Sequence, residues 1–340
     1  MRILCISVHP VLEYDEIQLF EEMGHEVFSL GFYSRRASGG NLRGPLPETD
    51  WHRSCLEAFV AQGCADVGGD ARWRVSRAFC AGFDVILVHH NYSFIAANWD
   101  EIAGSRVVWR TIGQAIHWAE DGMREYRNRG VKIVRWSLEE RFIERYIGAD
   151  AVIRTAKDPL DWGGWTGTTE RIVTFNNNFR ARGQGMSFDF HQHCVAGLPF
   201  DLYGLGNEDV PDWRGVAGPE EQKALLRRHR LAFVTGTNPA PYTLGFVEAW
   251  MTGIPVVHVG RQRFSGGAAG VYEIDHLIVD GESGFLVDDA YDAAGLFRTL
   301  LADHALCAAV SAKGRAAAIA IFGRGQAIAK WAAFFREHLE

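Results

Sequence analysis

The sequence has no excess of basic residues. Its 340 residues include 35 Lys and Arg against 42 Asp and Glu, which gives a formal net charge of −7. Proteins that grip a nucleic-acid backbone usually present a basic face, because neutralising phosphates supplies most of that affinity. The charge balance therefore lowers the odds of a nucleic-acid partner without excluding one.

Paired cysteines are also missing. The six cysteines have no close paired spacing, and several lie in apolar runs: Cys5, Cys55, Cys64, Cys80, Cys194 and Cys307. We expect free, buried thiols in a reducing cytoplasm. The segment 191–194 (HQHC) resembles half of a metal site, but no second ligand cluster lies at suitable spacing. No carboxylate cluster suited to a metal is evident either, so we expect no metal and no cofactor.

Long apolar runs are absent too. None approaches the ~20 residues that span a bilayer, so we expect no transmembrane segment. The N-terminus has one basic residue and a short apolar run that stops at His9-Pro10, without the cleavage site of a signal peptide. It is typical of a first strand. With 47% hydrophobic residues and a length of 340, the chain predicts a soluble protein of two domains and excludes bulk disorder.

Short β-branched runs alternate with helical periodicity in both halves of the chain. This rhythm predicts an α/β fold of two doubly wound, Rossmann-like domains with parallel sheets. Strands are expected at residues 2–8, 25–30, 83–88, 106–110, 149–154, 171–175, 199–203, 231–235 and 255–259. Helices are expected at 12–23, 137–146, 219–228 and 244–252, and a loop at 35–47.

The stretch 157–167 is dense in turn formers and is the best candidate linker. It separates a domain at 1–160 from a domain at 168–322, followed by a helical tail at 323–340 that can return to the first domain. Two such domains face a cleft, and ligands lie outside the carboxyl ends of the strands. The strand ends expected there are His89, Arg110, Tyr203, Thr235 and Val259.

Residues 235–257 read TGTNPAPYTLGFVEAWMTGIPVV, a strand end, a Pro/Gly loop and a helix that opens near Thr243 and closes at Gly253. The backbone N–H groups of Tyr242, Thr243 and Leu244 would form an anion site suited to a diphosphate. Glu248 lies deeper in the helix, where a carboxylate accepts hydrogen bonds from a ribose diol. The alternative is an ordinary strand–helix–strand crossover with a solvated Glu.

Residues 242–257 resemble the donor-binding signature of glycosyltransferase family four, whose members have the GT-B fold. Residues 279–287 (VDGESGFLV) follow where that family carries its second signature. The resemblance runs from about residue 217 to 301 and is only architectural elsewhere. It implies a nucleoside-diphosphate-sugar donor site in the domain at 168–322 and an acceptor site in the domain at 1–160.

The resemblance also implies roles for individual donor residues. Glu248 matches the second Glu of the family's Glu-x7-Glu pair, whereas the first falls at Ala240, so the usual contact to the donor sugar is missing. Arg180 and Arg182 are the candidates for the diphosphate, since a guanidinium pairs with phosphate in two places at once. The family's Lys is absent at its usual spacing, and two surface arginines are the alternative. Gly204 and Gly206 resemble the glycine loop beside the base.

The family often places a His near the transferred sugar, and His89 and His90 end a strand of the first domain. Adjacent side chains there point to opposite sides, and we favour His90 for the cleft because it is nearer the loop. Other residues expected on the acceptor side are His9, Arg110, Gln114 and His117. The aromatic and basic run that follows Trp109 lines an acceptor groove or forms a surface helix.

The resemblance implies a metal-independent glycosyltransferase that retains the anomeric configuration. The acceptor would be a glycan, a lipid-linked group or a small molecule. Three alternatives stay open: a nucleotide-sugar epimerase or inverting transferase of the same fold, a glucosyltransferase acting on DNA bases, and a non-catalytic nucleotide-sugar-binding protein. The loss of the first Glu at Ala240 keeps the last of these open.

Overall fold

The computed structural model describes residues 1–31, 49–113, 117–238, 240–264 and 270–339. The chain divides into two compact units. The first comprises Met1–Ile112, Ile116–Arg154 and Ala327–Glu340, and the second comprises Thr155–Gln326 with Gly113–Ala115. The segment 157–167, predicted as a linker, thus belongs to the second unit. The loop predicted at 35–47 lies outside the described residues.

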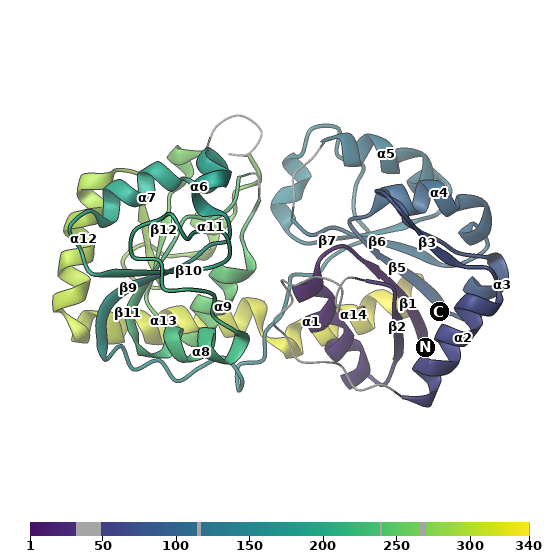
Figure 1. The fold of residues 1–340 in the computed structure, drawn as a ribbon, viewed down its shortest axis with the longest axis horizontal. Helices are drawn as coiled ribbons and strands as arrows, with labels where there is room; N and C mark the ends of the chain where they lie inside the picture. The colour runs from purple at the N-terminus through teal and green to yellow at the C-terminus, as the bar shows by residue number, and fades with distance from the viewer. Residues whose placement is uncertain (32–48, 114–116, 239, 265–269, 340) are drawn as a thin grey trace. The chain divides into compact units, whose positions relative to one another are not determined.

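The first unit contains a six-stranded sheet in the order β2-β1-β5-β6-β7-β8, with every neighbouring pair parallel (Figure 1). The strands are β1 (Arg2–Ser7), β2 (Glu26–Ser29), β5 (Val85–His89), β6 (Val107–Arg110), β7 (Lys132–Arg135) and β8 (Ala151–Val152). The helices are α1 (Pro10–Glu22), α2 (Asp50–Ala61), α3 (Arg77–Cys80), α4 (Tyr92–Ile102) and α5 (His117–Asn128). A separate antiparallel hairpin pairs β3 (Ala65–Gly68) with β4 (Arg72–Arg74).

The second unit contains a five-stranded parallel sheet in the order β10-β9-β11-β12-β13 (Figure 1). Its strands are β9 (Thr169–Phe175), β10 (Phe200–Tyr203), β11 (His229–Val234), β12 (Val256–Val259) and β13 (Phe285–Val287). Helices α7 (Phe188–Val195) and α12 (Ala290–Ala302) cover one face, and α8 (Pro219–Arg228), α9 (Leu244–Thr252) and α13 (His304–Phe322) cover the other. The short elements are α6 (Phe179–Arg182), η2 (Gly183–Met186), η3 (Arg261–Arg263) and α11 (Ile274–Leu277).

The predicted architecture of two doubly wound parallel sheets is confirmed, and the predicted strands agree with the structure within about two residues at each end. One predicted helix is wrong. Residues 137–146 form only the 3-10 helix η1 (Leu138–Phe142), which a capping box of Ser137 and Glu140 begins. The backbone at Ile143 is extended, with φ −62° and ψ 135°, so the helix ends after one turn. The sequence reading also missed β7, the β3–β4 hairpin and β13.

The C-terminal tail breaks at Gly323, between α13 and α14 (Arg324–His338). A Cβ atom at position 323 would lie 2.4 Å from the carbonyl oxygen of Ile319, so a side chain there would disrupt the junction. Helix α14 packs on α1 in the first unit. The ring of Phe20 lies 5.0 Å from that of Trp331 and 5.7 Å from that of Phe335, measured between centroids.

Helix α13 is long and apolar enough to cross a membrane by length and composition alone. One such helix is weak evidence, because the core helices of globular proteins pass the same test. In this structure the residues of α13 that are buried include Val310, Ala318 and Phe322. Phe322 lies against Trp250 of α9, with ring centroids 6.4 Å apart. The helix therefore forms part of the packing of the second unit.

Candidate functional site

Helix α9 begins where the sequence predicted. Thr243 is its N-cap, and its Oγ1 accepts a hydrogen bond from the backbone N–H of Phe246 at 3.3 Å. The N–H groups before Phe246 have no acceptor inside the helix, which is the general property of a helix start. Together with the helix dipole they favour an anion at this place. The helix ends at Gly253, which has a φ of 88°.

Glu248, the predicted ribose ligand, is 5% exposed and already holds two donors within its own unit. Its Oε1 accepts from Nζ of Lys157 at 2.7 Å, and its Oε2 accepts from Nε2 of Gln222 at 2.8 Å. The solvated Glu considered as the alternative is therefore wrong. The sequence reading missed both partners, because Lys157 is 91 residues away along the chain and Gln222 lies on another helix.

The segment that holds Lys157 is anchored to the second unit. Trp162 is 3% exposed, and the ammonium groups of Lys157 and Lys223 lie 5.2 and 5.5 Å from its ring centroid. Arg315 of α13 donates from Nη1 to the carbonyl of Trp162 at 2.6 Å and from Nη2 to that of Pro159 at 2.7 Å. These contacts fix the turn-rich segment in place.

Gly204 and Gly206, predicted beside a nucleobase, make room for a neighbouring loop. A Cβ atom at Gly204 would lie 2.0 Å from the carbonyl oxygen of Asn176, and one at Gly206 would lie 2.2 Å from Oδ1 of Asn178. Both glycines have positive φ, +137° and +67°. Asn207 joins the two loops, since its Nδ2 donates to the carbonyl of Asn176 at 2.6 Å. The loops that follow β9 and β10 therefore form one braced unit at the carboxyl edge of the sheet.

The two predicted phosphate-binding arginines lie on α6, directly after β9. Arg180 is half exposed, and its Nη1 pairs with Asp209 at 2.5 Å. Its guanidinium also lies 5.4 Å from the ring centroid of Phe188. Arg182 is exposed and ends the helix. Because β9 and β11 are parallel neighbours, α6 and the start of α9 follow the same edge of one sheet.

Tyr242 contributes to the core of the second unit rather than to a surface. It is 3% exposed, and its ring packs on Phe322 with centroids 5.1 Å apart. Its side chain therefore takes no part in the predicted contact to a diphosphate, which would involve the backbone. Ala240, which replaces the family's first Glu, is half-buried in the loop before the helix.

In the first unit, the two neighbouring histidines differ in burial. His89 is fully buried, with Nδ1 3.0 Å from Oγ of Ser7 and Nε2 2.9 Å from Oε2 of Glu16. His90 is half-buried and has a φ of 60°. Burial, and secondarily the charge of nearby His9, lower the pKa of His90 to about 4, so its imidazole is neutral at pH 7. Ser7 of β1 pairs with His89 of β5 in the parallel ladder, so the ends of these strands bring His9 and His90 near each other.

Arg110, expected on the acceptor side, is instead fully buried. Its Nε donates to Oε1 of Glu16 at 3.0 Å, and its guanidinium lies 5.5 Å from the ring centroid of Trp136. A cation at a strand end needs a counter-ion when it is buried, and Glu16 supplies it. His9 caps α1, with Nδ1 accepting from the N–H of Leu12 at 3.3 Å. His117 is exposed at the start of α5, and Gln114 lies outside the described residues.

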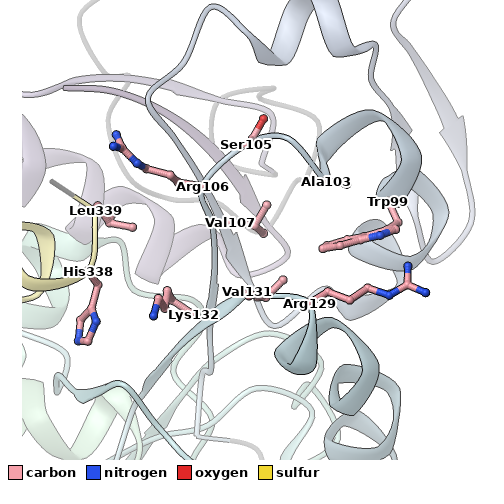
Figure 2. Close-up of a pocket in the computed structure, with 11 residues that line it drawn as sticks. Trp99, Ala103, Ser105, Arg106, Val107, Arg129, Val131, Lys132, His338 and Leu339 are labelled. Atoms are coloured by element: carbon pink, nitrogen blue, oxygen red, sulfur yellow. The ribbon is translucent and has the colours of Figure 1, made fainter.

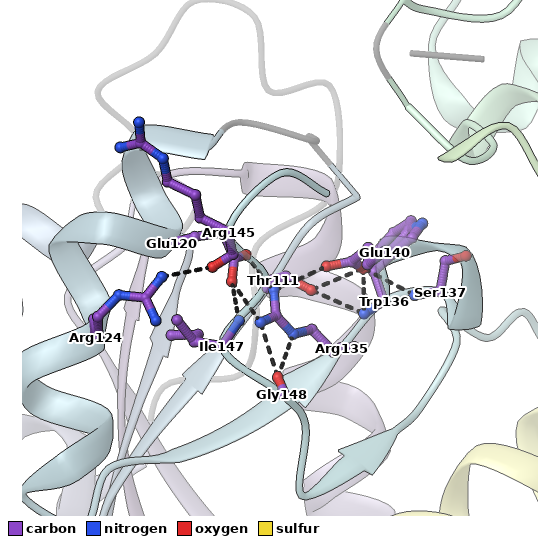
Figure 3. Close-up of polar contacts among 10 residues, drawn as sticks. All are labelled: Thr111, Glu120, Arg124, Arg135, Trp136, Ser137, Glu140, Arg145, Ile147 and Gly148. Atoms are coloured by element: carbon purple, nitrogen blue, oxygen red, sulfur yellow. Dashed lines mark hydrogen bonds and ion pairs between the residues drawn. The ribbon is translucent and has the colours of Figure 1, made fainter. Parts of the chain in front are cut away.

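A buried charge cluster supports the same edge of the first sheet (Figure 3). Arg135 of β7 pairs with both carboxylate oxygens of Glu120 at 2.5 and 2.8 Å. Glu140 accepts on Oε1 from the hydroxyl of Thr111 and from the N–H groups of Trp136 and Ser137, at 2.8–3.0 Å. Burial raises the pKa of Glu140 although Arg135 opposes the shift. The sequence reading missed this cluster, which fixes the start of the loop after β6.

A cavity of about 160 Å³ opens at the other edge of the first sheet, beside the amino ends of β6 and β7 (Figure 2). Trp99, Arg106, Lys132 and His338 are among the residues that line it. None of the predicted site residues lies there, because all of them follow the carboxyl ends of the strands. The cavity is therefore separate from the candidate site.

No family model and no curated protein matches the sequence. Similar solved structures include sucrose-phosphate synthase from Thermosynechococcus elongatus, with a TM-score of 0.68, 14% identity, and coverage of 99% of this chain and 98% of that one. HepE from Anabaena in complex with UDP-glucose matches with a TM-score of 0.67, 15% identity, and coverage of 99% and 100%. AviGT4, a glycosyltransferase of avilamycin A biosynthesis, matches with a TM-score of 0.58, 17% identity, and coverage of 100% and 98%. The chain therefore has the GT-B fold of these glycosyltransferases.

Proposed function

We propose that this chain is a glycosyltransferase that moves a sugar from a UDP-sugar to an acceptor hydroxyl, with retention and without a metal ion. The observation that carries the proposal is the start of α9, where a capped helix N-terminus stands ahead of the buried carboxylate of Glu248. That arrangement separates an anion site from a hydrogen-bond acceptor along one helix, as a nucleoside diphosphate requires. The complex of HepE with UDP-glucose, a protein of the same fold, supports UDP as the nucleotide.

The main chemical contribution is stabilisation of the leaving diphosphate. Negative charge builds up on the diphosphate as the sugar departs, and preorganised donors aimed at that charge give the largest catalytic term. The N–H groups at the start of α9 supply fixed dipoles, and Arg180 and Arg182 supply charge. The departing phosphate accepts the proton of the acceptor hydroxyl on the same face of the sugar. Among the described residues, no group of three His, Cys, Asp or Glu side chains is placed to hold a metal ion.

The first unit would supply the acceptor side. His90 stands at the carboxyl end of β5, half-buried and neutral at pH 7, and would hold a hydroxyl of the transferred sugar without adding charge. The acceptor would be a glycan, a lipid-linked group or a small molecule, and the reaction would take place in the cytoplasm. Five cysteines of the chain are free and buried, which supports a reducing compartment: Cys5, Cys64, Cys80, Cys194 and Cys307.

The test begins with thermal stability in the presence of UDP-, GDP-, ADP- and dTDP-glucose. A bound ligand stabilises the fold by mass action, by about 2.7 kcal/mol at a hundredfold excess over its Kd. We expect UDP-glucose to give the largest rise in Tm. Incubation with UDP-glucose alone then separates the enzyme classes, because an epimerase converts the sugar whereas a transferase at most hydrolyses it slowly.

A second candidate is a protein that binds nucleotide sugars without turnover. Ala240 favours it, since the methyl group cannot make the hydrogen bonds of the carboxylate that the resemblance leads one to expect there. Tight binding of UDP-glucose without release of UDP in the presence of any acceptor hydroxyl, water included, would favour the binding protein over the enzyme.

A further inference from the structure

Lys157 and Gln222, which both contact Glu248, differ in charge and burial. Lys157 is 3% exposed and brings a full positive charge to Oε1, whereas Gln222 is half-buried on α8 and brings a neutral amide to Oε2. A buried carboxylate is stable as an anion only beside a counter-charge. Lys157 therefore fills a need that Gln222 does not.

Lys157 is also held firmly at both ends. Its backbone N–H donates to the carbonyl of Phe322 at 3.0 Å, and its Nζ lies 5.2 Å from the ring centroid of Trp162, which is itself buried. A long, flexible side chain normally loses rotamer entropy when it binds a partner. Here the surrounding contacts restrict it beforehand, so the ammonium stands at a fixed position beside Oε1.

We propose that Lys157 is a positioning residue for the ribose of the nucleotide, acting through Glu248, and that Gln222 yields its place at Oε2 to a ribose hydroxyl. The inference rests on the proposed function. The amide of Gln222 lies on the more exposed side of the Glu248 carboxylate. It donates a neutral hydrogen bond to Oε2, and a ribose hydroxyl can donate the same kind of hydrogen bond in its place. Lys157 lies on the buried side of the carboxylate. There it supplies the counter-charge and fixes the orientation of the carboxylate while a ribose hydroxyl replaces Gln222 at Oε2.

The chain offers a matched control in Lys223. Its Nζ lies 5.5 Å from the same Trp162 ring, but it pairs with Asp161 at 2.6 Å and Glu220 at 2.8 Å and not with Glu248. Removing either ammonium removes one cation from Trp162. Of the two substitutions, the one at Lys157 removes a cation that pairs with Glu248.

The experiment measures by calorimetry the Kd of UDP and of 2′,3′-dideoxy-UDP for the wild type, Lys157→Met and Lys223→Met. Lys157→Met should weaken UDP binding about tenfold, because a hydrogen bond to a poorly oriented or protonated carboxyl loses its charge-assisted part. Dideoxy-UDP should bind Lys157→Met as it binds the wild type, since it lacks the hydroxyls that Glu248 accepts from. Lys223→Met should bind both nucleotides with unchanged Kd.

Three results of this calorimetric experiment would overturn the proposal. Unchanged UDP binding by Lys157→Met would make Lys157 a mere counter-ion, and an equal loss for both nucleotides would mean that it acts on the fold. In both cases the wild type still binds UDP, so the proposed function stands. Absence of UDP binding by the wild type would overturn the proposed function and this inference together.

Lys157→Met leaves a buried carboxylate without its cation and so risks unfolding. The double variant Lys157→Met/Glu248→Gln avoids that risk, because it removes both charges of this buried pair. It is compared with Glu248→Gln, in which the ammonium of Lys157 loses its carboxylate partner. If Lys157 acts only through the carboxylate, these two variants bind UDP with equal Kd. A further loss in the double variant would overturn the proposal. Gln222→Ala should bind UDP as tightly as the wild type or more tightly, and a tenfold loss there would contradict its displacement.

Discussion

Nε2 of His89 lies 2.9 Å from Oε2 of Glu16, in a place where both side chains are withdrawn from solvent. Arg110 binds the other oxygen of the same carboxylate at 3.0 Å. Although burial opposes it, the charge of Arg110, together with the contact to His89, holds the pKa of Glu16 below its usual value. The end of β5 thus divides its neighbouring histidines between two tasks, with His89 in the core and His90 towards the surface.

Substitution of His89 should therefore affect stability, whereas substitution of His90 should affect activity. His89→Ala should lower the free energy of unfolding by about 1–3 kcal/mol, because it leaves buried polar groups without a partner. His90→Asn should leave stability within about 0.5 kcal/mol, since Asn tolerates the positive φ of this position. If His90 contacts the transferred sugar, kcat should fall by about tenfold or more. Urea unfolding and UDP-release assays measure the two effects, and a stable His89→Ala with an unstable His90→Asn would contradict the assignment.

Gly204 tests the brace between the loops after β9 and β10. Gly204→Ala places a Cβ 2.0 Å from the carbonyl oxygen of Asn176, whereas Gly215→Ala meets nothing within 4 Å although its φ is also positive, at +106°. The control should lose about 1–2 kcal/mol through backbone strain alone. Gly204→Ala should lose about 1–3 kcal/mol more, through the forced shift of the Asn176 loop. Equal losses in urea unfolding would mean that the loops are not packed as described.

The burial of His191 leads us to predict that the protein loses stability in acid. It is fully buried, with Nε2 2.9 Å from Oγ1 of Thr174 and its ring stacked on Phe233 at 5.0 Å. Burial lowers its pKa to about 3, from an ordinary value of 6.5. Between these values the unfolded chain binds the proton and the folded chain does not, so stability falls as the pH is lowered below about 6.5. The contribution amounts to about 2 kcal/mol at pH 5.

The measurement compares unfolding at pH 7 and pH 5 for His191→Phe and for His193→Gln. His191→Phe should reduce the acid-induced loss of unfolding free energy by about 2 kcal/mol. The reason is that the variant has no imidazole at this position that takes up a proton only in the unfolded chain. His193 is exposed on the same helix, so His193→Gln should unfold with the pH dependence of the wild type. Identical pH dependence in His191→Phe and the wild type would mean that His191 takes up its proton in the folded state.

Arg180 tests the diphosphate site. Its pair with Asp209 is solvent-exposed, so Arg180→Ala should change the free energy of unfolding by no more than about 1 kcal/mol. It should weaken UDP binding by about 1.5–3 kcal/mol, the range for a charge-assisted hydrogen bond. Asp209→Asn keeps the guanidinium and should bind UDP at least as well as the wild type. Calorimetry that finds the same Kd for Arg180→Ala and the wild type would remove Arg180 from the site.

The sequence predicts those parts of the fold that local chemistry determines. Helices α8 and α9 begin and end where Pro219, Thr243 and Gly253 place their signals, and the parallel sheets follow from the alternation of strands and helices. A helix-start signal in the sequence does not by itself fix the length of the helix, because tertiary contacts also act on the same residues. Ser137 and Glu140 form a capping box, but the carboxylate of Glu140 is also held by Thr111, and the helix stops after one turn.

Contacts between distant residues account for what the sequence does not predict in the site. Glu248 is recognisable from its helix, but its pairing with Lys157 depends on how residues 157–162 fold back on the second unit. Arg110 is charged and ends a strand, so it is expected at a surface. Its burial depends on Glu16 of α1, 94 residues earlier. In both cases the partner becomes evident only in three dimensions.

The central claim is that the carboxylate of Glu248 receives the ribose of a nucleotide, and Glu248→Gln tests it most directly. The measurement is the Kd of UDP and of 2′,3′-dideoxy-UDP for the wild type and this variant, by calorimetry. Gln keeps the shape but loses the charge, so UDP should bind about tenfold more weakly, while dideoxy-UDP should bind both proteins alike. An equal loss for both nucleotides, or no loss for UDP, would show that Glu248 is not the ribose ligand and would contradict the account.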